Sequence, residues 1–92
     1  MSNLKKLKNQ WLSNAQVKRA YDEMTPEFAI AKTLIAARIK AGLTQEEVAE
    51  RMVTTQSVIA RLEAGNSLPS MKSLYRYAAA TGTKPAIQLR HV

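Results

Sequence analysis

"LTQEEVAERMVTTQSVIARLEAG", residues 43–65, contains two threonines that each stand directly before a glutamine. Thr44 and Glu47 have the spacing of a capping box, in which each side chain bonds to the backbone N–H of the other residue. This pattern predicts a short helix over residues 45–52. The helix is locally well specified although it is barely two turns long.

Thr55 is placed to cap a second helix, from residue 56 to about residue 64, which Gly65 ends. The two helices are joined by only about three residues. Ala49 is small enough to let the second helix cross the first closely. This combination matches a helix-turn-helix pattern.

Two longer helices flank this stretch. Thr25 followed by Pro26 predicts the start of a helix that runs to about residue 41. Its expected apolar face is Phe28, Ala31, Ile35 and Ile39. Ser70 is placed to cap a further helix that Gly82 closes, and its expected buried side is Met71, Leu74, Tyr77 and Ala78.

The two ends of the chain differ from this core. The first two dozen residues have the spacing of two amphipathic helices, whose apolar stripe either folds onto the core or binds a partner. That stripe consists of Leu4, Leu7, Trp11, Leu12, Val17 and Tyr21. Residues 86–90 alternate like a strand, which needs an edge in another copy or another protein.

The chain is therefore expected to have an all-α fold with a short C-terminal strand. We divide its 92 residues into an N-terminal helical extension (1–24), a helix-turn-helix domain (25–82) and a C-terminal strand (83–92) that is a candidate for dimerisation. The N-terminal helices are the other candidate for joining two copies.

The net charge and the composition limit the classes of function that the protein can have. Fourteen Lys and Arg against seven Asp and Glu give a net charge of +7, which attracts polyanions such as nucleic acid but also serves solubility. The chain has no Cys and one His, His91, so we expect no catalytic site, no metal site and no cofactor. No apolar run is long enough to span a membrane and no export signal is seen, so we expect a cytoplasmic protein.

The outer face of the second short helix is the candidate DNA-reading surface. Ile59 and Leu62 share its inner side, which leaves Gln56, Ser57 and Arg61 facing outward with Ala60. A glutamine amide donates and accepts at once, so Gln56 suits the N6 and N7 of adenine. Gln45 is expected either to stand beside a phosphate or to brace Gln56.

Further DNA contacts are expected from Thr55, Asn66 and Lys72, although an exposed lysine is also common on any soluble helix. Arg38 and Glu63 are assigned to structure instead. They lie where the first core helix and the end of the second short helix are expected to meet, and a pair there would set the angle between the two helices.

The segments "AGLTQEEVAERM", "TTQSVIARLEAG" and "LPSMKSLYRYAAATG" resemble the Cro and lambda-repressor type of helix-turn-helix, the XRE family, over residues 28–82. With "VKRAYDEMTPEFAIAKTLIAARIKAG" ahead of them and the terminal strand behind, the whole chain is similar to HigA-type antitoxins. The resemblance implies a lambda-repressor-like bundle that binds and silences a RelE/HigB-type, mRNA-cutting toxin. It also implies a homodimer that represses its own operon, acts in the bacterial nucleoid, and reads operator DNA with Gln45, Gln56, Ser57 and Arg61.

Two features depart from that family. Val53 stands where the family usually has glycine in the turn, so we expect another turn conformation or backbone strain. The toxins of the family tend to be basic, so a chain of charge +7 must rely on local acidic residues such as Asp22 and Glu23, or on apolar burial. The apolar stripe of residues 1–24 is therefore our candidate toxin-binding surface. The competing hypotheses are a free-standing repressor of phage type without a toxin partner and, least favoured, an enzyme.

Overall fold

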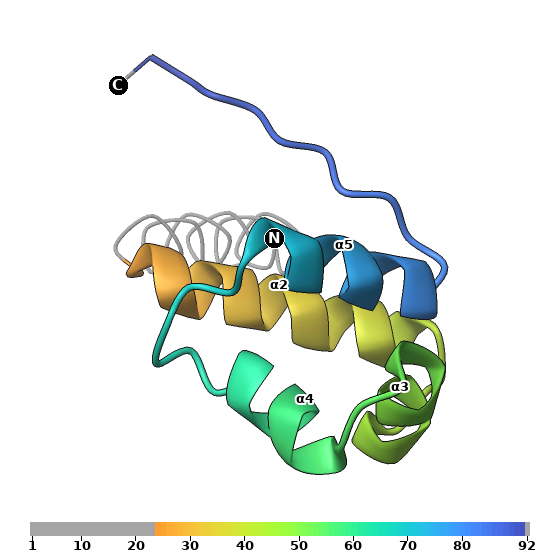
Figure 1. Ribbon diagram of the computed structural model, residues 1–92. Coiled ribbons are helices and arrows are strands. Elements are labelled where there is room, and N and C mark those ends of the chain that lie inside the picture. Colours follow the sequence, from red (N-terminus) through yellow and green to blue (C-terminus); the bar gives the residue numbers. More distant parts are fainter. Residues whose placement is uncertain (1–23, 92) are drawn as a thin grey trace, which may run out of the picture.

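The computed structural model of the chain describes residues 24–91. These residues form helices α2 (Pro26–Lys40), α3 (Gln45–Met52), α4 (Gln56–Leu62) and α5 (Met71–Ala80), and they contain no strand. α2 and α5 lie side by side, and α3 and α4 pack against each other on one side of that pair (Figure 1). The prediction of an all-α, lambda-repressor-like fold is confirmed.

Each of the four described helices begins directly after the residue that the sequence predicted as its cap. Four hydroxyl side chains accept from the third residue after them, which satisfies a backbone N–H that the helix itself leaves unpaired. The capping box of α3 is complete in both directions. The distances from the hydroxyl oxygen to the donating backbone nitrogen are 3.3 Å for Thr25 and Phe28, 3.1 Å for Thr44 and Glu47, 3.4 Å for Thr55 and Val58, and 3.1 Å for Ser70 and Ser73.

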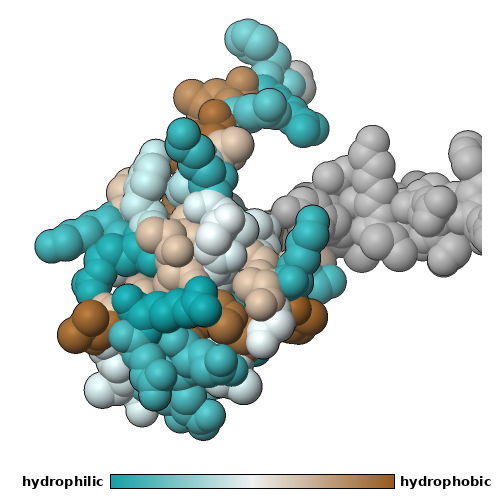
Figure 2. Space-filling view, turned by 90° about the vertical axis from the view of Figure 1, so that its right-hand side faces the viewer, coloured by the Kyte–Doolittle hydropathy of each residue, from teal (hydrophilic) through white to brown (hydrophobic). Residues whose placement is uncertain are grey.

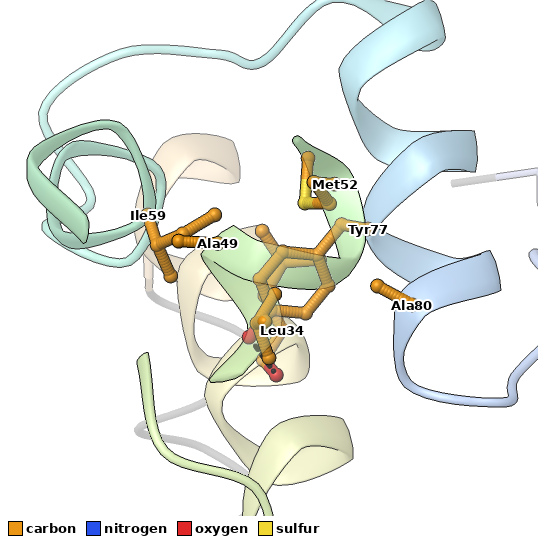
Figure 3. Packing of buried hydrophobic residues seen from close by; sticks show 7 residues of the cluster. Leu34, Ala49, Met52, Ile59, Tyr77 and Ala80 are labelled. Atoms are coloured by element: carbon orange, nitrogen blue, oxygen red, sulfur yellow. Dashed lines mark hydrogen bonds between the residues drawn. The ribbon is translucent and has the colours of Figure 1, made fainter. Parts of the chain in front are cut away.

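The core lies where the four described helices converge. Tyr77, Ile59 and Val48 are fully buried, and Tyr77 stands in the middle of the cluster with Ile59 on the side of α4 (Figure 3). The tyrosine hydroxyl lies 2.9 Å from the carbonyl oxygen of Leu34, a hydrogen bond that ties α5 to α2. The remaining buried members of the cluster are Leu34, Ala49, Met52 and Ala80.

The predicted inner face of α2 is largely wrong. Ala31 is buried as expected, but Phe28 and Ile39 expose 50% and 64% of their surface, and Leu34 is buried instead. The reason is that Arg38 turns inward to a buried carboxylate. The inward line of α2 therefore runs through Ala31, Leu34 and Arg38, at the spacing of three and four residues that one helix face requires.

The C-terminal strand that the sequence predicted is not formed within the single chain. The last backbone hydrogen bond in this region runs from Thr83 N to Ala78 O at 2.9 Å, and beyond it the tail extends away from α5 (Figure 1). An isolated extended segment has no strand to pair with, so no ladder forms. Ile87 and Leu89 are left 60% and 97% exposed, and hydrophobic atoms are visible on the projecting tail in Figure 2.

The amphipathic helices predicted in the first two dozen residues lie outside the described residues, apart from Met24. The same holds for Asp22, Glu23 and the six apolar residues proposed to contact a toxin. Within residues 24–91, no helix is both long enough and apolar enough to cross a membrane.

Candidate nucleic-acid interface

The outer face of α4 is presented to solvent as the sequence predicted. Gln56, Ser57 and Arg61 are exposed, whereas Ile59 is fully buried beneath them and Leu62 is half-buried. Ala60, which the sequence placed outward, is half-buried. The buried isoleucine fixes the rotation of α4 about its own axis, so the three polar side chains point away from the core.

The turn before α4 has the left-handed conformation that usually belongs to glycine. Val53 has φ 53° and ψ 53°, and its side chain is 88% exposed. The backbone is closed by two hydrogen bonds, from Val53 N to Glu50 O at 3.1 Å and from Thr54 N to Ala49 O at 2.9 Å. Of the two outcomes expected here, the turn keeps its geometry and carries strain, at a cost of about 1–2 kcal/mol for a residue with a Cβ.

A buried ion pair anchors the far end of α4. Arg38 donates from Nε and Nη2 to the two carboxylate oxygens of Glu63, each at 2.9 Å, and from Nη1 to the carbonyl oxygen of Leu43 at 3.1 Å. The side chain of Glu63 is only 3% exposed, so the pair lies largely out of water. The structural role expected for these two residues is confirmed.

Tyr77 also contacts this carboxylate. Its hydroxyl lies 2.8 Å from Glu63 Oε2 and donates its single proton either there or to Leu34. Burial raises the pKa of the Tyr77 hydroxyl, and the adjacent Glu63 raises it further. The hydrogen bond with Glu63 raises the pKa of Arg38.

Burial alone would raise the pKa of Glu63, but hydrogen bonds from Arg38, Tyr77 and Gln45 outweigh it and leave the pKa below its ordinary value. Glu63 is therefore ionised at neutral pH.

Gln45 and Gln56, the first residues of α3 and α4, are hydrogen-bonded to each other. Gln56 Nε2 donates to Gln45 Oε1 at 2.8 Å, and Gln45 Nε2 donates to Glu63 Oε1 at 3.2 Å. Of the two roles expected for Gln45, the structure shows the bracing one. A continuous hydrogen-bonded chain thus links the exposed amide of Gln56 to the buried carboxylate.

The other predicted DNA contacts are not joined to this chain of hydrogen bonds. Thr55 caps α4 from an exposed position, Asn66 is exposed in the loop between α4 and α5, and Lys72 is exposed in the first turn of α5. Neither Asn66 nor Lys72 takes part in the hydrogen bonds that join Gln56, Gln45 and Glu63.

Two arginines that the sequence analysis did not single out hold α3 and α5 together. Arg51, near the end of α3, donates from Nη1 to the carbonyl oxygen of Ala80 at 2.9 Å. Arg76, on α5, donates in return to the carbonyl oxygen of Met52. Each guanidinium satisfies a carbonyl at the end of the other helix, where helices leave carbonyls unpaired. Arg51 stands in the last turn of α3, where a basic residue is a sequence signal for such a contact, whereas Arg76 does not stand in the last turn of α5.

Among residues 24–91, no group of three or more His, Cys, Asp or Glu side chains is placed to hold a metal ion.

Comparison with known proteins agrees with this geometry. The model of the helix-turn-helix family matches residues 34–88, well over half of the chain. An uncharacterized HTH-type transcriptional regulator of Methanothermobacter thermautotrophicus is 46% identical over 52 residues, which are 55% of this chain and 75% of the relative. No solved structure matches the chain significantly. The family model describes a DNA-binding regulatory domain rather than a catalytic one. The chain therefore belongs to the XRE-type helix-turn-helix family, and it is a DNA-binding transcriptional regulator.

Proposed function

We propose that this protein represses transcription by placing α4 of each copy of a dimer in successive major grooves of an operator. The observation that carries the proposal is the outward face of α4, where Gln56, Ser57 and Arg61 are exposed over a fully buried Ile59. The three side chains would contact base edges and neighbouring phosphates. Repression then follows from occupancy of the site, with no bond made or broken.

Contacts to the DNA backbone are the second part of the proposal. Thr55, Asn66 and Lys72 are exposed near α4 or at the start of α5, and polar or cationic side chains in such positions bind phosphates. The net charge of +7 supports a large counterion-release contribution to affinity. A repressor of this kind would act at the bacterial nucleoid, in the cytoplasm.

A dimer is proposed because two-fold operators are read by two recognition helices about 34–36 Å apart. The tail, residues 83–92, is our candidate for joining the copies by antiparallel pairing, and the N-terminal extension (1–24) is the alternative. The tail offers unpaired backbone groups and the exposed side chains of Ile87 and Leu89. It also borders an apolar groove of about 690 Å³ lined by Ala29, Ile30, Met71, Leu74, Pro85 and Ile87. If deletion of residues 84–92 leaves the mass in solution at that of a dimer, the tail is excluded.

DNA binding is tested by selection from a library of duplexes with a randomised core of about 20 base pairs. The wild-type chain is expected to enrich a two-fold site, with half-sites one helical turn apart. Its affinity should fall steeply as salt rises. Selection of no sequence, with only weak salt-dependent binding, would contradict the repressor proposal.

We also propose that the protein is the antitoxin of a type II toxin-antitoxin pair and silences a RelE/HigB-type toxin by direct binding. Support comes from the resemblance of the whole sequence to HigA-type antitoxins and from the apolar stripe in residues 1–24. Contact through that stripe requires no bulk attraction between two basic proteins. The competing proposal is a free-standing repressor of phage type. Coexpression with the neighbouring reading frame decides: a stable complex that suppresses toxicity favours the antitoxin, and no complex favours the lone repressor.

A further inference from the structure

The exposed amide of Gln56 is not free to turn over, because its neighbours dictate which end faces inward. Gln56 Nε2 donates to Gln45 Oε1 at 2.8 Å, and Gln45 Nε2 donates to Glu63 Oε1 at 3.2 Å. Amide nitrogen and oxygen have nearly the same shape, so hydrogen-bond partners alone decide such an orientation.

At the buried end of this series of hydrogen bonds, only one direction of donation is possible. Glu63 also receives hydrogen bonds from Arg38 and lies beside the Tyr77 hydroxyl, so it is an ionised carboxylate and can only accept. Gln45 must therefore present its NH₂ group to Glu63. Its carbonyl oxygen then faces Gln56 and requires a donor there. Gln56 in turn points its NH₂ group inward and keeps its carbonyl oxygen outward.

We propose that Glu63 is a positioning residue which, through Gln45, fixes the outward edge of the Gln56 amide and so selects adenine over guanine at one position of each half-site. The inference rests on the proposed operator binding. In this orientation Gln56 offers an outward oxygen and one remaining N–H. Adenine presents the matching donor N6 and acceptor N7, whereas guanine presents two acceptors, O6 and N7, in the major groove. A reversed amide, with two outward N–H groups, suits guanine instead.

We call the hydrogen bonds that run from Gln56 through Gln45 to Glu63 the relay. Gln45→Met tests it, because methionine has nearly the length of glutamine but neither donates nor accepts strongly. The site enriched by the wild-type chain from the randomised duplex library is the probe. The position in question is the one whose base preference Gln56→Ala erases. At that position, Gln45→Met is expected to lower the adenine-to-guanine preference at least about fivefold, while preferences elsewhere stay unchanged. Adding Gln45→Met to Gln56→Ala should have no further effect on preference at that position.

Glu63→Gln is the second arm, because an amide at this position both donates and accepts and no longer imposes a polarity. It is measured at a temperature at which circular dichroism shows the variant folded. The same loss of adenine preference is expected, whereas a purely structural role of Glu63 would lower stability and leave that preference in place. Lys32→Met, at an exposed position of α2 that neither proposal uses, is the control and should leave the base preference unchanged.

The outcomes separate the two proposals. If the wild-type chain selects a site but a folded Glu63→Gln variant, or Gln45→Met, keeps its adenine preference, the proposed role of Glu63 is wrong and the repressor stands. If Glu63→Gln does not fold, Gln45→Met alone decides. If the wild-type chain selects no site, the proposed function itself fails.

Discussion

Arg38 and Glu63, which are 25 residues apart in the sequence, form an ion pair with two 2.9 Å hydrogen bonds between α2 and the residue that ends α4. Tyr77 reaches the same carboxylate from α5, and Gln45 reaches it from α3. One buried side chain is thus contacted from every other described helix. The position of α4 relative to the rest of the core depends on it, and so does the surface that α4 presents.

Removal of one partner of this pair should be costly. Arg38→Met leaves a carboxylate that is 3% exposed without its counter-ion, so we expect a loss of about 3–5 kcal/mol in the free energy of unfolding. Urea denaturation followed by circular dichroism measures the loss. The double variant Arg38→Met/Glu63→Leu should recover much of it, because no buried charge remains. Lys40→Ala, exposed on the same helix, is the control and should stay within about 0.5 kcal/mol. A loss below about 1 kcal/mol for Arg38→Met would contradict the account.

Acid should weaken the fold through Glu63. The pKa of this carboxyl is lower in the folded chain than its ordinary value of 4.5, so folding favours the charged form. The stabilisation is complete above pH 4.5 and is lost as pH falls through the lower folded pKa. The thermal midpoint, measured between pH 6 and pH 2.5, is expected to fall steeply at the acid end. Glu63→Gln should start lower and fall less steeply, whereas parallel curves for the two proteins would show that other carboxylates control acid unfolding.

The turn should tolerate glycine better than its native residue. Val53 has φ 53° with its side chain 88% exposed, so Val53→Gly relieves strain and removes little packing. Glycine also makes the unfolded chain more flexible, which offsets part of the gain. We expect a net gain of about 0.5–1 kcal/mol, seen as a rise of about 2–8 °C in the thermal midpoint. Val53→Ala keeps a Cβ and serves as the control, with no comparable gain. Equal behaviour of the two variants would mean that the turn stores no strain.

Local signals in the sequence predicted the helices well. Thr25, Thr44, Thr55 and Ser70 each cap where expected, because a cap depends on contacts within three residues and needs no knowledge of the rest of the fold. The inward and outward sides of α4 follow from Ile59 alone. The pairing of Arg38 with Glu63 was also predicted.

Contacts between helices were harder to predict. The inner face of α2 was misplaced because an isoleucine is usually more buried than an arginine, whereas here Arg38 turns inward and Ile39 is exposed. The contacts of Tyr77 and Gln45 with one carboxylate depend on how three helices converge. Sequence periodicity describes each helix alone and carries no information on that convergence.

The reciprocal arginine contacts between α3 and α5 give another prediction. Arg51 donates to Ala80 O, and Arg76 donates to Met52 O, next to the strained turn. Arg51→Ala and Arg76→Ala are each expected to lower the free energy of unfolding by about 1–2 kcal/mol, because loss of the charged donor leaves a helix-end carbonyl unpaired. Chemical denaturation provides the measurement. Arg61→Ala, an exposed arginine on α4, is the control and should have little effect on stability. If all three variants unfold alike, the contacts do not stabilise the fold.

The last prediction separates base reading from phosphate binding. Gln56 faces outward from α4 with an amide that can both donate and accept, so Gln56→Ala should lower discrimination between the selected site and other sequences by about 1–3 kcal/mol. Lys72 is exposed at the start of α5 and offers only a charge, so Lys72→Ala should weaken binding to all sequences alike and reduce the salt slope by about one. Titrations of selected and scrambled duplexes at several salt concentrations measure both quantities. The two variants thus serve as each other's controls, since stability is expected to change little in either. A Gln56→Ala protein with unchanged preference would show that another side chain reads the base, because no loss of charge accompanies this substitution.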